Sequence, residues 1–97
     1  MNYIDEVQTE LAKHIKVGKG LMRVYSLLVL VKGVNTTLED VHDAWAVNIN
    51  ENWDVFANGK HRSMIPFDQL PPEIQAKDQE YVDAIVATAL ALTEERK

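Results

Sequence analysis

The chain has 97 residues, and 46% of them are hydrophobic, which is typical of one small globular domain and excludes both intrinsic disorder and a second core. The net charge of −5 argues against nonspecific nucleic-acid binding, and the lack of cysteine excludes disulfides and thiolate metal sites. No signal-peptide pattern is seen, and the longest apolar run, residues 24–31, is too short to span a bilayer. We therefore expect one cytoplasmic domain over residues 1–97 that does not bind membranes.

Two apolar segments in the N-terminal part of the chain (residues 3–32) predict helices. In the first segment, apolar side chains recur at helical spacing, namely Ile4, Val7, Leu11 and Ile15. This spacing predicts a helix over residues 3–16 that ends at the two glycines that follow. The second segment, residues 21–32, is apolar nearly all round, which is typical of the buried centre of a helical bundle. Gly33 fits the end of this helix.

A third helix is expected after Thr36-Thr37-Leu38-Glu39, which has the form of a capping box in which Glu39 reaches back to a threonine amide. The helix should fray near residues 48–52. Residues 53–69 show no period, and Asn58-Gly59 marks a tight turn or a short hairpin. Pro71-Pro72 suits the first turn of a fourth, closing helix. The predicted fold is all-α: a small four-helix domain with a long irregular loop between helices 3 and 4.

Aromatic rings gather around the third helix and the segment that follows it. Trp45 and Trp53 offer faces on which a base can stack, although Trp45 shares the apolar stripe of its helix and can equally belong to the core. Trp53 lies where the helical period ends, so a place in a cleft and a place in the core both stay open. His42 lies beside the apolar stripe, from which it can donate to a ligand or to a nearby carbonyl.

The best candidate for anion binding is a short basic cluster in the irregular connection. It consists of Lys60, His61, Arg62 and Ser63. Arginine can hold a phosphate with two hydrogen bonds while lysine acts as a point charge. The alternative is a solvated loop that pairs with Asp54 or Asp68. We interpret Pro66 and Phe67 as structural residues that pin this loop onto the core.

Two further groups of residues are candidates for binding sites. Lys77, Asp78 and Tyr81 share one side of the predicted fourth helix, where they can face a pocket or form a solvated charged face. Gly18-Lys19-Gly20 precedes a helix but lacks the spacing of a phosphate-binding loop, so we interpret it as an ordinary turn between helices.

The residue pattern gives little support for a catalytic site. The three histidines (His14, His42 and His61) fall in separate predicted elements and lack metal-ligand spacing. Neither Ser26 nor Ser63 lies in the glycine frame of a nucleophile elbow. We therefore expect a domain that is not an enzyme and that uses no metal and no cofactor.

The order of several short motifs resembles the ryanodine-receptor-type repeat, the RyR domain, over about residues 38–92. The motifs are His42-x-x-Trp45-Ala46, Trp53, a polar loop, Met64-Ile65-Pro66-Phe67 and Leu70 before a helix. Three positions depart from the family pattern: Asn52 replaces a glycine, Arg62 a proline and Phe67 a tyrosine. The chain resembles a single copy of the prokaryotic or phage type, whereas the receptors carry these repeats in tandem pairs.

The resemblance implies a cytosolic, non-catalytic module, and nucleotide binding has been proposed for the receptor repeats. It implies a nucleotide-derived ligand, cyclic or signalling, that stacks on Trp45 or Trp53 while its phosphate meets Lys60, His61 and Arg62. His42, Ser63 and Tyr81 complete the expected site. A phage protein of this kind would act as a sponge that sequesters the nucleotide signals of anti-phage defence.

A second hypothesis is a protein-interaction or oligomerisation module without a small ligand. The small size of the chain and its strongly apolar second helix predict a homo-oligomer that buries part of residues 21–32. Both hypotheses are compatible, since an oligomer can build a pocket between subunits. The net charge of −5 leaves DNA and RNA as disfavoured partners.

Overall fold

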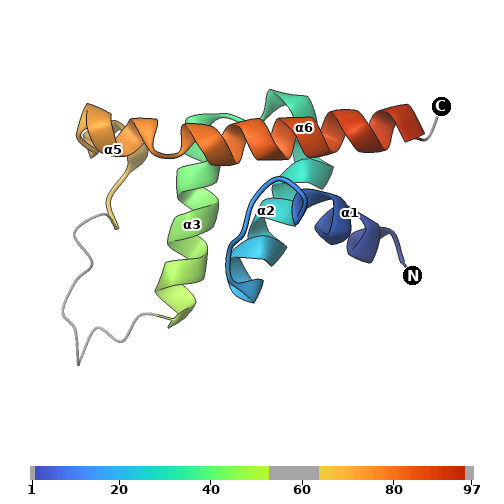
Figure 1. The fold of residues 1–97 in the computed structure, drawn as a ribbon. Coiled ribbons are helices and arrows are strands. Elements are labelled where there is room, and N and C mark those ends of the chain that lie inside the picture. The colour runs from blue at the N-terminus through green and yellow to red at the C-terminus, as the bar shows by residue number, and fades with distance from the viewer. Residues whose placement is uncertain (1, 53–63, 96–97) are drawn as a thin grey trace.

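The structure is a computed structural model that describes residues 2–52 and 64–95, and the statements below refer to these ranges. The elements in chain order are α1 (Tyr3–Leu11), α2 (Lys19–Val31), the 3-10 turn η1 (Gly33–Asn35), α3 (Leu38–Asn52), the 3-10 turn η2 (Phe67–Gln69), α5 (Pro72–Ala76) and α6 (Gln79–Glu95). The described ranges contain helices and no strand, which confirms the all-α prediction (Figure 1). The predicted Asn58-Gly59 turn lies outside them.

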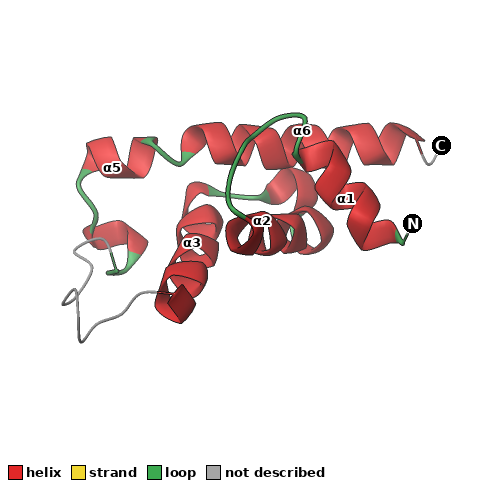
Figure 2. Cartoon of the chain, turned by 60° about the horizontal axis from the view of Figure 1, so that its bottom comes forward, coloured by secondary structure: helices red, strands yellow, loops and turns green. Residues whose placement is uncertain are grey.

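The long helix α6 organises the domain. It packs against α1, α2 and α3, which lie on one side of it in Figure 1. In the turned view of Figure 2, α2 and α3 lie next to each other, and α5 continues the line of α6 beyond α3. This arrangement leaves a corner where the start of α6, the adjoining α5 and the sides of α2 and α3 come together.

The core is built from the face of α6 that meets the three N-terminal helices. The side chains with no exposed surface there are Val7, Leu11, Val41 and Ile85. Tyr25 is buried with them, and the buried Thr88 hydroxyl is satisfied because it donates to the Ala84 carbonyl oxygen at 2.8 Å. Val7 and Leu11 on the predicted stripe of the first helix, and Val41 on that of the third, therefore belong to the core.

The first helix is shorter than predicted. It ends at Leu11, and the amides of Lys13 and His14 bond to carbonyls three residues back, which tightens the chain into a turn. Ile15 and Val17 then pack against the core from the segment that leads to α2. The prediction of a helix over residues 3–16 was wrong at its end, because these apolar side chains reach the core without helical geometry.

The start of α3 carries a reciprocal cap, one residue later than the predicted one. The Thr37 hydroxyl accepts from the Asp40 amide at 3.1 Å, and an Asp40 carboxylate oxygen accepts from the Thr37 amide at 2.9 Å. Thr36 instead donates its hydroxyl to the Gly33 carbonyl oxygen at 2.8 Å. Gly33 has φ of +54°, a left-handed conformation that favours glycine, and it ends α2 as predicted.

The second helix is buried on one side only. Tyr25 and Val29 face the core, whereas Leu27, Leu30 and Val31 are exposed. The prediction of a helix buried nearly all round was therefore wrong: the neighbouring helices cover one face of α2 and leave an aliphatic face open. At the start of α2, Gly20 lies so close to Asn48 of α3 that a β-carbon there would collide with it.

The predicted fourth helix is interrupted. Its first part is α5, with the expected proline in the first turn, and the amides of Lys77 and Asp78 bond to the Ile74 and Gln75 carbonyls in a tight turn. The Asp78 carbonyl oxygen then accepts from the amides of Tyr81 and Val82, so α6 begins directly after Asp78. The break places Asp78 at the junction of two helices.

Ser26 has the one buried side-chain polar atom of the described ranges that lacks a hydrogen-bond partner. Replacing Ser26 by alanine should raise the free energy of unfolding by about 1 kcal/mol, because a buried unsatisfied hydroxyl is costly and alanine favours helix. Chemical denaturation measures this change. The control is Thr88→Val, which removes a hydroxyl that is hydrogen-bonded and should not stabilise. A Ser26→Ala variant less stable than the parent would contradict the assignment.

Candidate functional site

A pocket of about 740 Å³ lies in the corner between α2, α3 and the α5–α6 junction, and we call it the junction pocket. Its polar and aromatic lining consists of Tyr25, His42, Trp45, Glu73, Lys77, Asp78 and Tyr81. The side chains of Leu70 and Ile74 form an apolar part of its wall. Pockets of this volume with apolar walls and a few convergent polar groups are typical of small-molecule sites.

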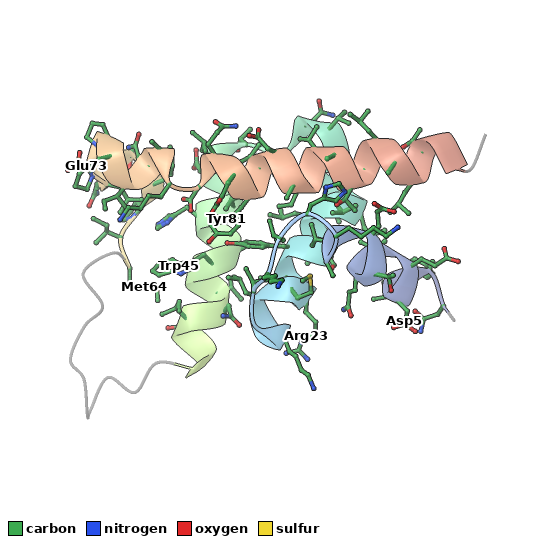
Figure 3. The ribbon with its side chains drawn as sticks, in the orientation of Figure 1. Asp5, Arg23, Trp45, Met64, Glu73 and Tyr81 are labelled. Atoms are coloured by element: carbon green, nitrogen blue, oxygen red, sulfur yellow. The ribbon has the colours of Figure 1, made fainter. Side chains whose placement is uncertain are left out.

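Aromatic rings form two walls of the junction pocket. The rings of Tyr25 and Tyr81 lie 5.5 Å apart between centroids, at an interplanar angle of 36°. The rings of His42 and Trp45 lie 5.6 Å apart and nearly parallel, at 22°. Figure 3 shows Tyr81 projecting from α6 on the side that faces α3, and Trp45 projecting from α3. Tyr25 and His42 are almost fully buried in these pairs, so the aromatic surface open to a planar group belongs to the partly exposed Trp45 and Tyr81.

His42 is held in place by the segment that precedes α5. Its ring is only 4% exposed, and Nε2 donates to the Ile65 carbonyl oxygen at 2.7 Å. The ring also lies 6.1 Å from that of Phe67. The sequence left two roles open for His42, donation to a ligand or to a nearby carbonyl. The structure shows donation to a carbonyl. His42 thereby fixes residues 64–70 against α3 and forms a rigid part of the pocket wall.

Asp78 is the half-buried acid of the junction pocket. Burial raises the pKa of its carboxyl above the ordinary value of 3.8, and the nearby His42 acts in the opposite direction. Within residues 2–52 and 64–95, no hydrogen bond or ion pair engages this carboxylate. A carboxylate that is partly desolvated and unpartnered is costly to the fold and is available to a ligand that donates hydrogen bonds.

The two tyrosines keep their hydroxyls protonated. Burial raises the pKa of Tyr25 well above its ordinary value, and the charge of Asp78 adds to the rise. Burial likewise raises the pKa of Tyr81, with contributions from Glu80 and Asp78. Both hydroxyls therefore remain hydrogen-bond donors through the physiological pH range, close to an acceptor carboxylate.

The raised pKa of Asp78 makes stability depend on pH. Below its ordinary pKa of 3.8, the carboxyl is protonated in both the folded and the unfolded chain. As the pH rises, the unfolded chain loses this proton first, so ionisation of Asp78 weakens the fold from that pH upward. Asp78→Asn should therefore raise the melting temperature at pH 7 but not below the ordinary pKa. A control is Asp83→Asn on the exposed side of α6, and an unchanged melting temperature of Asp78→Asn at pH 7 would contradict the account.

The structure brings together three of the predicted site residues, His42, Trp45 and Tyr81, around one pocket. Lys77 and Asp78 also line it, with Lys77 exposed and Asp78 half-buried. Sequence reasoning missed Tyr25, although an aromatic ring in an otherwise aliphatic helix was a usable signal. The remaining predicted residues lie outside the described ranges: Trp53, Lys60, His61, Arg62 and Ser63.

No group of three or more histidine, aspartate or glutamate side chains in residues 2–52 and 64–95 is arranged to hold a metal ion. No helix there combines the length and the apolar character needed to cross a membrane.

Comparison with known families gives one match, to the model described as "Domain of unknown function (DUF7701)", over residues 1–90. The chain belongs to the DUF7701 family. Comparisons with curated proteins and with solved structures give no match. In this DUF7701 domain the matched range includes every residue that lines the junction pocket, so the pocket lies wholly within the family domain.

Proposed function

We propose that this DUF7701 domain is a non-catalytic module that binds a nucleotide-derived ligand in the junction pocket. The observation that carries the proposal is the lining of this pocket of about 740 Å³, which combines aromatic side chains with the half-buried carboxyl of Asp78. A base placed between Trp45 and Tyr81 gains stacking, worth about 1–3 kcal/mol per base on protein platforms. Asp78 and the tyrosine hydroxyls then hydrogen-bond its edge.

The phosphate end of such a ligand needs positive charge, and Lys77 is the lysine or arginine among the described residues that line the junction pocket. Lys77 lines the junction pocket and is exposed, so its ammonium group can meet a phosphate at the pocket mouth. We propose that Lys60, His61 and Arg62 assist it. Their support is the residue types alone, together with the resemblance to RyR domains, for which nucleotide binding has been proposed.

Isothermal titration calorimetry with mono-, di- and cyclic nucleotides tests this function. We expect at least one nucleotide to bind, and Lys77→Ala and Arg62→Ala to weaken its binding by roughly threefold to tenfold, as loss of one partly solvated charge contact would. Lys16→Ala, an exposed lysine that does not line the pocket, serves as the control. A complete lack of binding at millimolar concentration, or affinities unchanged in both variants, would overturn the proposal.

The exposed aliphatic face of α2 supports a second candidate, self-association. Leu27, Leu30 and Val31 lie three and four positions apart on α2, and Val31 is 64% exposed. We propose that this face packs against a second copy. Light scattering should then give a mass that rises with concentration in the parent and stays monomeric in Val31→Glu. A parent mass that stays monomeric at all concentrations would contradict this candidate.

A further inference from the structure

The junction pocket combines hydrogen-bond acceptors with hydrogen-bond donors. The Asp78 carboxylate presents two acceptor oxygens and has no partner in residues 2–52 and 64–95. Tyr25 and Tyr81 line the same pocket as Asp78, their ring centroids lie 5.5 Å apart, and the charge of Asp78 contributes to the raised pKa of both hydroxyls. Asp78 lies at the start of α6, and Tyr81 follows it within one turn. The two acceptor oxygens of Asp78 and the hydroxyl donors of the tyrosines therefore belong to one pocket.

The common bases differ in the hydrogen-bond donors and acceptors that they present to a carboxylate and a tyrosine hydroxyl. Guanine carries two adjacent donors, N1–H and the N2 amino group, followed by the O6 acceptor. Adenine carries one amino donor beside the N1 acceptor, and cytosine likewise has one donor beside an acceptor. A carboxylate placed against either of these last two edges meets a lone pair, and one of its oxygens loses its partner. Guanine alone satisfies both carboxylate oxygens and one tyrosine hydroxyl.

We infer that Asp78 is the specificity-determining residue of the junction pocket and that it selects a guanine nucleotide. The carboxylate accepts from guanine N1–H and from the N2 amino group, a tyrosine hydroxyl donates to O6, and the base lies against the aromatic walls. This inference rests on the proposed function, which it deepens by naming the base. His42 supports the arrangement because it fixes the wall beside Asp78 and donates its own Nε2 proton elsewhere.

Calorimetry with four nucleoside monophosphates tests the inference at neutral pH. In the parent domain we expect guanosine monophosphate to bind best. Inosine monophosphate, which lacks the N2 amino group, should bind roughly tenfold more weakly, as expected for the loss of one charge-assisted hydrogen bond. Adenosine monophosphate should bind more weakly still. The Asp78→Asn variant should lose at least roughly tenfold in guanosine monophosphate affinity and gain affinity for xanthosine monophosphate. Asparagine can donate to its C2 carbonyl while accepting from N1–H.

Asp78→Asn keeps a good helix-capping residue at this position and should melt no lower than the parent, so a change in affinity is not a folding defect. The control variant is Asp83→Asn, on the same helix but away from the pocket. Adenosine monophosphate binding as tightly as guanosine monophosphate would overturn the inference while leaving nucleotide binding intact. An Asp78→Asn variant whose affinity for guanosine monophosphate is unchanged would likewise overturn the inference. Failure of all four nucleotides to bind would overturn the proposed function itself.

Discussion

Replacing Leu11 by alanine lowers the free energy of unfolding by about 2–5 kcal/mol, the range found for large-to-small changes in well-packed cores. Leu11 is 0% exposed and ends α1, where it packs in the cluster that joins α1, α2 and α6. The truncated side chain leaves a cavity, and the neighbouring side chains on the three helices cannot move enough to fill it. For a domain of this size the melting temperature falls by roughly 4–8 °C per kcal/mol.

The matched control is the same substitution at Leu90, which lies on α6 and is 51% exposed. Leu90→Ala should change the free energy of unfolding by no more than about 0.5 kcal/mol, because little apolar surface is removed from a packed environment. Thermal and chemical denaturation followed by circular dichroism measure both variants. Equal losses at Leu11 and Leu90 would show that α1 does not share a core with α2 and α6.

The second large effect is expected at His42. Replacing His42 by alanine removes the hydrogen bond to the Ile65 carbonyl and the ring contacts with Trp45 and Phe67. The expected loss is about 2–4 kcal/mol, since a partly buried carbonyl loses its partner and a cavity opens where the buried His42 ring was. Amide hydrogen exchange in residues 64–70 should accelerate, because His42 is what fixes this segment to α3.

His42→Phe separates the two contributions. It keeps an aromatic ring of similar shape but removes the donor, so about 1–3 kcal/mol should be lost and residues 64–70 should still exchange faster. Asp43→Ala, at an exposed neighbouring position on α3, provides the baseline. If His42→Phe were as stable as the Asp43→Ala variant, the bond to Ile65 would not be what holds the segment.

The helices were predictable where one apolar stripe dominates. Val7 and Leu11 lie on the predicted stripe of α1, and both are buried. The predicted helix bounds were wrong where tertiary contacts override the local sequence pattern. Ile15 continues the helical spacing but packs on the core from a non-helical segment. The break before Asp78 could not be predicted, because the apolar residues on both sides of it continue the helical spacing.

The pocket was only partly predictable. His42, Trp45 and Tyr81 could be named from residue type, but periodicity does not say which side chains from distant helices meet. Tyr25 reads as a core residue in the sequence and is nearly fully buried, yet it also lines the pocket. The resemblance to RyR domains stays a prediction. The contacts of His42 with Ile65 and Phe67 nevertheless show that two of the motifs on which it rests pack together.

The central claim is that the junction pocket holds the ligand, and amide chemical shifts recorded during titration with a guanine nucleotide test it most directly. The account predicts saturable shifts concentrated at Tyr25, His42, Trp45 and residues 77–81, with none at Asp5 and Thr9 on the far helix α1. Shifts that are absent at millimolar nucleotide, or that cluster away from the α5–α6 junction, would contradict it.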